Sequence, residues 1–203
     1  MPSFNITVPD IHQGPGYLWY NVQLPGAGGR LLIDANGNPV NGSPIPMGAS
    51  DGAATFNMEA KIGEITIDQE TAPVDALMTA ESAYIEVTLK ESSLAKIGKA
   101  LAHATYSTGT DASLPSGAQA YEQLTVGGLV AVPQAPVALI SPRRGCSAPG
   151  KFMVACLYSS YAKDPFQIGF TRTKEAVYKV RFEGLALISR LQGDRVAQFY
   201  RQV

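Results

Sequence analysis

The sequence predicts a mainly β protein, in which antiparallel strands form a β-sandwich or barrel with one flanking helix and a long projecting loop. Two segments, 64–68 and 84–89, alternate apolar and polar residues, which is typical of strands with one buried face. Strands before and after a single helical segment favour this architecture. Further strand candidates occupy the last third of the chain, at 123–132, 137–140, 152–158 and 177–188.

The first third of the chain is rich in loop-forming residues. A strand-like segment at 17–24 precedes a glycine-rich stretch, and Asp34-Ala-Asn-Gly-Asn38 predicts a hairpin turn. Prolines, glycines and serines then accumulate up to residue 54. A compact core has little use for so long an irregular stretch, so we interpret residues 25–55 as a projecting arm or loop. Residues 73–79 predict a separate strand that begins at a proline.

Residues 92–102 predict a short amphipathic helix packed on a sheet, with Ser92 able to cap its start. Its apolar residues recur at helical spacing at Leu94, Ile97 and Leu101. The Ser-, Thr- and Gly-rich run 106–117 predicts a loop. The end of the chain is compatible with a strand or an extended tail, and we expect 190–203 to form a C-terminal extension of a single domain spanning 1–203.

Composition narrows the class of protein. The chain has 203 residues, of which 45% are hydrophobic and 16% charged, so it can bury a core without disulfides or metal ions. No apolar run reaches the ~18 residues of a membrane-spanning helix, and the start lacks the pattern of a signal peptide. No run of Lys or Arg exceeds two residues, which argues against a basic nucleic-acid-binding domain.

The charges are divided unevenly along the chain. Residues 1–122 carry 13 acids and 5 bases, whereas residues 123–203 carry 4 acids and 11 bases. Such a division suits head-to-tail self-association through complementary patches. It would lose this meaning if the two parts of the chain interleave in the fold.

No sequence motif assembles an active site. Gly145 to Lys151 matches a phosphate loop, but Pro149 removes an N–H group, Phe152 replaces the hydroxyl residue, and a strand follows where a helix is required. A calcium loop starting at Asp34 lacks the required glycine and final glutamate. The histidines, His12 and His103, stand apart from other metal ligands. We therefore expect no enzyme activity, no cofactor and no metal.

The two cysteines, Cys146 and Cys156, could face each other across a turn. In a protein made in the cytoplasm we expect them to be reduced. Neither has an identifiable activating base, so neither is a good candidate nucleophile.

One region resembles a known family. The residues that carry the resemblance are Gly48-Ala-Ser-Asp-Gly-Ala-Ala-Thr-Phe56, Ile65-Thr-Ile-Asp-Gln69, Thr71-Ala-Pro-Val-Asp75, Met78-Thr-Ala-Glu81, Ile85-Glu-Val-Thr-Leu89 and the helix from Leu94 to Leu101. Their order resembles that of the major tail tube protein of long-tailed bacteriophages, over residues 48–102.

The resemblance implies a β-sandwich with one helix, six copies of which form a ring. Rings would stack into a hollow tube that conducts DNA without binding it specifically. It further implies a place in the virion tail after assembly in the host cytoplasm. The implied partners are other copies of the chain, the tape measure, the tail terminator and baseplate or tail-tip proteins, with no insertion into a membrane.

In such a tube, three groups of residues would face partners or DNA. Acidic residues on polar strand faces are candidates to line the channel or, equally, the outer surface: Glu64, Asp68 and Glu86. Candidate ring-to-ring contacts in the 25–55 arm are Asp34, Asn36, Asn38, Asn41 and Met47. A candidate basic interface comprises Arg143, Arg144 and Lys151.

Other functions remain open at this point. The chain could instead be the tube subunit of another injection apparatus or a tail terminator. From a different class, a monomeric β-sandwich binding module could use Tyr17, Trp19 and Tyr20 as a sugar-binding platform.

Overall fold

The computed structural model describes residues 15–26, 28–66, 68, 72–90, 93–101, 103–113, 117–142, 151–163, 167–168 and 176–202. It is mainly β, with antiparallel sheets and one helix, as the sequence predicts. The elements are β1 (Tyr17–Val22), β2 (Gly42–Pro46), β3 (Thr55–Ile65), β4 (Asp75–Leu89), α1 (Leu94–Ala100), β5 (Ala104–Asp111), β6 (Gln119–Val126), β7 (Ala135–Pro142), β8 (Phe152–Ala162), β9 (Tyr178–Gly184) and β10 (Ala197–Arg201).

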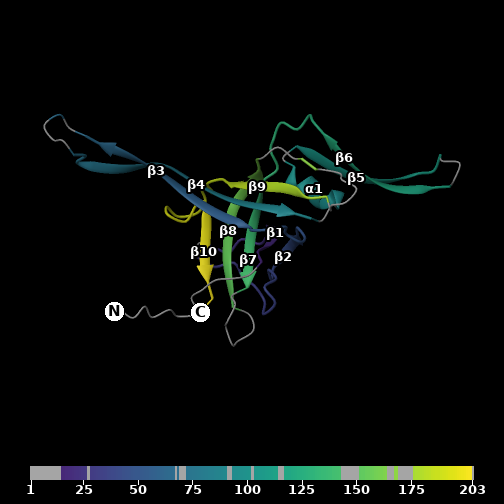
Figure 1. Cartoon of the computed structure of the whole chain (residues 1–203), viewed down its shortest axis with the longest axis horizontal. Helices are drawn as coiled ribbons and strands as arrows, with labels where there is room; N and C mark the ends of the chain where they lie inside the picture. Colours follow the sequence, from purple (N-terminus) through teal and green to yellow (C-terminus); the bar gives the residue numbers. More distant parts are fainter. Residues whose placement is uncertain are drawn as a thin grey trace.

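Eight strands form one branched sheet, and β5 and β6 form a separate two-stranded sheet. The order in the large sheet is β2-β1-β7-β8-β9-β4-β3, with β10 also paired to β8. One edge of β8 pairs with β10 over residues 153–157 and with β9 over residues 160–162. The sheet therefore divides at β8 into two layers, which cross at a steep angle (Figure 1).

The main core lies between these layers. In β4 and β9, buried apolar residues alternate with more exposed polar ones, which confirms the predicted alternation over 84–89. Phe182 and Tyr178 are among the largest fully buried side chains. The apolar side chains that meet in this core include Leu18, Val137, Leu139, Ala155 and Leu157 from one layer and Ile85, Val87, Leu89, Val180 and Phe182 from the other.

A second core covers the opposite face of β7 and β8. Leu31 and Val22 pack there against Ile140, Val154 and other residues of the two strands. Because β7 and β8 are covered on both faces, nearly every residue in their central parts is buried. This explains why both strands are continuous apolar runs in the sequence, without alternation.

The predicted arm at 25–55 lies largely against the sandwich, and the prediction is wrong in this respect. β2 pairs with β1, Leu31 is buried in the second core, and Met47 is fully buried in the main core. The hairpin turn is confirmed: the Asp34 carboxylate accepts N–H groups from Asn36 and Asn38, each at 2.8 Å. The sequence predicts the turn because its hydrogen bonds are local. It does not predict that the segment packs on the sandwich, because that packing depends on residues far away in the sequence.

The chain projects elsewhere, through two β-hairpins (Figure 1). The strands predicted separately at 73–79 and 84–89 form one 15-residue strand, β4, which pairs with β3 along its length. The strand predicted at 64–68 ends at Ile65, and β3 instead extends back to Thr55. The prediction of a loop over 106–117 is wrong for residues 106–111, which belong to β5. This threonine-rich segment is a strand because it pairs with β6.

The helix is shorter than predicted. It spans Leu94–Ala100, with Ser93 at its N-cap position and no side-chain capping hydrogen bond, whereas Ser92 lies outside the described residues. Of the predicted apolar face, Ile97 is buried, and Leu94 and Leu101 are partly buried against the main core. Ala100 is buried as well. The end of the chain is a strand rather than an extension, since β10 pairs with β8 and the Gln202 N–H bonds to the Phe152 carbonyl at 2.9 Å.

A network of polar side chains holds the β9–β10 connection against β8 and the segment after β1. Arg190 is only 6% exposed, and its Nη2 atom lies 2.7 Å from Oδ2 of Asp194. Its Nη1 atom donates to the Pro25 carbonyl at 2.9 Å, and its Cζ atom lies 3.8 Å from the ring centroid of Tyr158. The Tyr158 hydroxyl also donates to Asp194. Three segments distant in sequence are thus joined by one charge-assisted cluster.

The variant Asp194→Asn tests this network. We expect its free energy of unfolding at pH 7 to be about 2 kcal/mol lower, because a buried guanidinium loses its carboxylate. The expected loss is smaller than for a fully buried pair, since the Asp194 side chain is 27% exposed. Urea denaturation measures the difference. Asp75→Asn, which alters an exposed carboxylate in β4, is the control and should leave stability unchanged.

The same variant has an expected pH signature. Desolvation raises the pKa of Asp194, but hydrogen bonds from Tyr158 and Arg190 outweigh it and hold the pKa below its ordinary 3.8. A lowered pKa contributes stability above pH 3.8 that is lost as the pH falls through the folded-state value. The gap between wild type and variant should therefore narrow in acid. A gap that is constant from pH 6 to pH 3 would contradict this role.

Candidate assembly surfaces

The described residues hold no cluster suited to metal chemistry. Among them, no group of three or more His, Cys, Asp or Glu side chains could hold a metal ion. Over the same residues, no helix is long and apolar enough to cross a membrane. Cys156 is fully buried, and desolvation raises the pKa of its thiol to about 12, so it is poorly suited to act as a nucleophile.

The segment resembling a phosphate loop lies mostly outside the described residues, as does Cys146. Its last residue, Lys151, is half-buried, and β8 begins immediately after it at Phe152. The predicted strand is thus confirmed where a phosphate loop would need a helix.

The β3–β4 hairpin extends beyond the sandwich as a two-stranded ribbon. β4 pairs with β9 only from Tyr84 to Leu89, so its outer half has β3 as its one described partner strand. A two-stranded ribbon in water is marginally stable by itself. This part of the hairpin is therefore a surface that a partner would stabilise.

An exposed apolar stripe follows one face of this hairpin. Met58 pairs with Ala83, which is buried in the main core, and Ile62 pairs with Met78. Residues 58 and 62 share a face of β3, so the three side chains Met58, Ile62 and Met78, which we call the hairpin stripe, continue the core-facing side outward. They are 62%, 65% and 60% exposed. The sequence analysis missed this stripe, although alternate apolar residues from 56 to 62 signalled it.

The β5–β6 hairpin projects from the helix side of the molecule (Figure 1). Its base is anchored by Leu124, which packs on the main core and against Gly98 of α1, where an added Cβ would lie 2.9 Å from a Leu124 methyl. Farther out, the Tyr121 ring lies over Gly109, where a Cβ would come within 2.5 Å of the phenolic oxygen. Both glycines thus make room for side chains that brace the hairpin.

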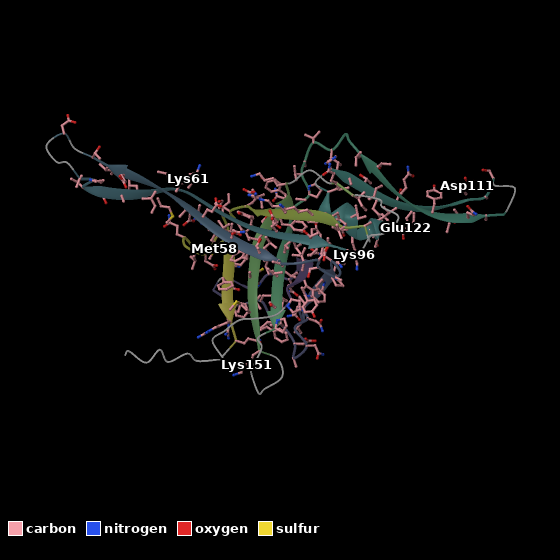
Figure 2. All side chains as sticks on the ribbon, viewed as in Figure 1. Met58, Lys61, Lys96, Asp111, Glu122 and Lys151 are labelled. Atoms are coloured by element: carbon pink, nitrogen blue, oxygen red, sulfur yellow. The ribbon has the colours of Figure 1, made fainter. Side chains whose placement is uncertain are left out.

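Acidic and basic residues gather at different parts of the molecule. Residues 55–81, which span most of the β3–β4 hairpin, contain six carboxylates and one lysine, and residues 104–126 contain two carboxylates and no lysine or arginine. Figure 2 shows Asp111 far out on β5–β6 and Lys151 at the opposite side of the sandwich. Arg201 pairs with Met153 there, and Arg30 lies 5.9 Å from the Tyr200 ring centroid.

The body of the sandwich, by contrast, neutralises many of its charges locally. Lys163 and Lys179 lie 2.9 and 3.0 Å from the carboxylates of Glu183 and Glu86. Among the described residues, carboxylates thus predominate on the two hairpins, and the basic residues Arg30, Lys151 and Arg201 lie apart from them. The division along the sequence is kept only in part, because Arg30 belongs to the acidic part of the chain and Lys163 and Lys179 are paired on the body.

The three candidate lumen residues do not lie together. Glu64 is exposed in the outer part of β3, and Asp68 lies in the adjoining turn. Glu86 instead sits on the body of the sandwich, where it pairs with Lys179. Glu86 therefore belongs to a different, paired surface of the subunit from Glu64 and Asp68. A channel-lining role for Glu64 and Asp68 stays a prediction.

The candidate ring-contact residues divide in the same way. Asn36, Asn38 and Asn41 are exposed, whereas Asp34 is partly buried within its own turn. Met47 is fully buried, so the prediction that it makes a contact between rings is wrong. Of the candidate basic interface, Arg143 and Arg144 lie outside the described residues and Lys151 is half-buried.

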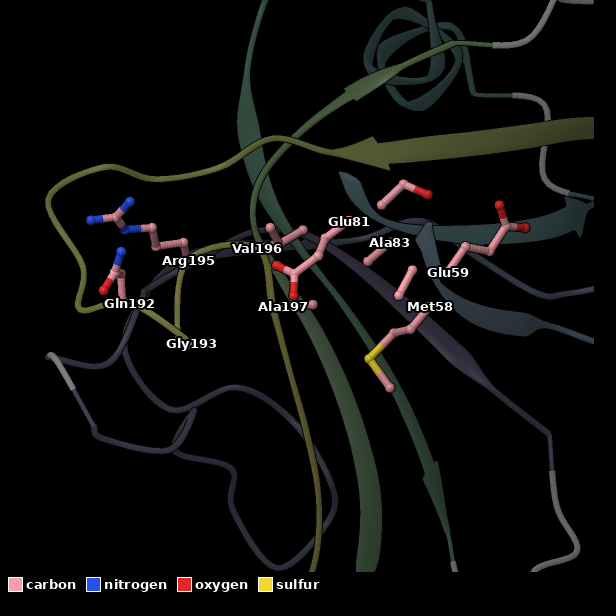
Figure 3. A pocket seen from close by; sticks show the side chains of 11 residues that line it. Met58, Glu59, Glu81, Ala83, Gln192, Gly193, Arg195, Val196 and Ala197 are labelled. Carbon is pink, nitrogen blue, oxygen red and sulfur yellow. The ribbon is translucent and has the colours of Figure 1, made fainter. Parts of the chain in front are cut away.

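A groove of about 460 Å³ separates the hairpin base from the β9–β10 connection (Figure 3). Met58, Glu59 and Glu81 line one side, and Gln192 and Arg195 line the other. The Arg195 Nε atom donates to the Arg190 carbonyl at 3.1 Å. The groove leaves Met58, the innermost residue of the hairpin stripe, accessible beside charged groups.

The aromatic residues of β1 do not form one platform. Trp19 packs against the second core, whereas Tyr20 packs against the main core and lies 6.0 Å from the Phe182 ring. Adjacent residues of a strand point to opposite faces, so Trp19 and Tyr20 cannot stack together on one ligand.

Comparison with protein-family models and with curated proteins finds no significant match to this chain. A proposal of function therefore rests on the surfaces described above and on the sequence resemblance over residues 48–102.

The double variant I62D/M78D tests the hairpin stripe. We expect it to fold normally and to lose self-association, because two carboxylates on an apolar contact face oppose burial. Circular dichroism checks folding, and light scattering at increasing concentration checks association. The charge-matched control A80D/S82D alters the opposite face of the same ribbon and should associate like the wild type. Equal loss in both variants would show that added charge, rather than the stripe, is responsible.

Proposed function

We propose that this protein is a structural subunit that self-assembles into stacked rings forming a phage tail tube, a conduit for DNA delivery into the host. The observation that carries the proposal is the β3–β4 hairpin, which projects as a two-stranded ribbon with an exposed apolar stripe. Exposed large apolar side chains that gather on one face of a protein are typical of an interaction site. A neighbouring copy would cover the stripe and stabilise the ribbon.

The sheet edges support an assembly role. Among the described strands, β2 and β3 end the order of the large sheet, so each has one edge without a strand partner. Open edges favour pairing with further chains, and closure into a ring would remove them. The hexameric ring remains part of the proposal through the resemblance over residues 48–102.

The spatial division of charge supports head-to-tail stacking. Acidic hairpins of one copy would approach the basic end near Arg30, Lys151 and Arg201 of the next. Repeated heterologous contacts of this kind build open filaments when the rotation between copies does not close. An acidic tube wall would repel DNA phosphates, so DNA would pass without specific binding.

The proposed location is the virion tail, after assembly in the host cytoplasm, with no catalytic role. The proposed partners are further copies of the chain and the tape measure, tail terminator and baseplate or tail-tip proteins. A tube of another injection apparatus, or a terminator, would share the assembly surfaces and differ in its partners. A monomeric binding module would need no partner for the hairpin stripe.

Negative-stain electron microscopy of the purified full-length protein tests this function. We expect rings or stacked tubes with a central channel at concentrations near ~1 mg/ml, and their loss in I62D/M78D, because hydrophobic contacts dominate the cores of stable interfaces. A single ring that never stacks would favour a terminator. Scattering masses that stay monomeric up to tenfold higher concentration would overturn the tube and favour the binding module.

Salt dependence tests the stacking contact. Screening acts over ~10 Å at 0.1 M ionic strength, so the attraction between separated acidic and basic surfaces should weaken as salt rises. We expect the initial rate of polymerisation, followed by light scattering, to fall about tenfold between 0.05 and 0.5 M NaCl. Preformed tubes should dissociate far less. A rate that is flat or rises with salt would mean that apolar burial alone drives stacking.

A further inference from the structure

A second groove, of about 440 Å³, lies where the two layers of the sandwich separate. Phe56 and Met58 at the start of β3 line one side, and Leu139, Met153 and Phe199 of the other layer line the opposite side. The rings of Phe56 and Phe199 stack with centroids 5.8 Å apart. Met58 and Phe199 are 62% and 52% exposed, so the described residues leave this apolar corner of the core open to solvent.

The free edge of β3 borders this groove. β3 ends the order of the large sheet, and β4 is its described partner strand. An additional strand on this edge would extend the β9-β4-β3 layer over Met153 and Phe199 and close the corner. Main-chain pairing would hold such a strand, and pockets for alternate side chains would select it.

The chain itself enters the groove from its N-terminal side. Pro15 and Gly16 are part of the lining, and the Ser141 hydroxyl donates to the Pro15 carbonyl at 2.9 Å. A Cβ on Gly16 would lie 2.8 Å from a Leu139 methyl, so this position needs a glycine for the chain to pass so closely. The described part of the chain therefore begins at the groove.

The sequence of residues 1–14 suits an edge strand. Phe4, Ile6 and Val8 alternate with Asn5 and Thr7, which is the pattern of a strand with one apolar face. Pro2 and Pro9 bracket this segment, and proline ends strand pairing because it lacks an N–H group. Six residues separate Val8 from Pro15, and at ~3.3 Å per residue they reach ~20 Å, enough to turn back along β3.

We propose that residues 4–8 add as a strand to the free edge of β3 in the same chain, with Phe4, Ile6 and Val8 filling the groove. The short tether favours the chain's own segment over a second copy, since it keeps the effective concentration in the millimolar range. The proposal concerns the completion of one subunit and does not rest on the tube function. It adds one strand to the β9-β4-β3 layer beside Phe56 and Met58, so the outer part of β3 and the edge of β2 stay open to neighbouring copies.

Alternate-position variants of the full-length chain test the side-chain assignment. In F4S/I6S/V8S we expect the fluorescence of the apolar dye ANS to rise several-fold and the melting temperature to fall by about 5–10 °C, because an apolar face is lost from a site that remains open. The matched control N5S/T7S changes the opposite face of the proposed strand and should behave like the wild type. Equal effects in the two variants, or no effect in either, would overturn the proposal.

Disulfide trapping identifies which chain supplies the strand. The variant carries I6C and M58C in a Cys146→Ser background, and Cys156 is retained because it is fully buried. Under mild oxidation we expect a monomer with an internal disulfide, and a yield several-fold lower for T7C with M58C. Disulfide-linked dimers would mean that a second copy occupies the groove, and an absence of bonding would mean that the segment does not reach it. Either result would overturn the proposal, while dimers alone would leave the tube function standing.

Discussion

The backbone groups along one edge of β8 are shared between two partner strands, β10 over residues 153–157 and β9 over residues 160–162. A strand edge can pair with only one neighbour at each position, so the sheet has to divide there. The remainder of the architecture depends on this division. It creates two layers, places Ile85, Val180 and Phe182 opposite Leu139 and Leu157, and leaves β7 and β8 buried on both faces.

The division also limits how much of each layer can be covered. β4 is 15 residues long, but β9 supports only its last six residues. The outer half of β4 and its partner β3 must therefore leave the sandwich as a ribbon, with the core-facing pattern continued by Ile62 and Met78. The same geometry opens the groove between Phe56 and Phe199. The exposed apolar surface at these two places is thus a consequence of the fold, and it lies where further chain segments can pair.

The polar contacts divide into two kinds. The contacts around Arg190 and Asp194 are largely shielded from solvent and join segments distant in sequence. They therefore stabilise one arrangement of the β9–β10 connection. Those on the body, such as Lys179 with Glu86, are more exposed and contribute little to stability. Their effect is to cancel charge on the sandwich, which leaves the net acidic character to the hairpins and the basic character to the opposite end.

The sequence by itself determined the elements whose physics is local. Alternation located the buried faces of β4 and β9, continuous apolar runs located β7 and β8, and the Asp34–Asn38 turn was readable because its carboxylate bonds to its own backbone. Only the tertiary structure decided which segments project. Residues 25–55 look like an arm, yet Leu31 and Met47 dock into two cores, while 106–111 look like a loop and form a strand against β6. Docking and strand pairing depend on contacts between residues far apart in sequence, which no local pattern encodes.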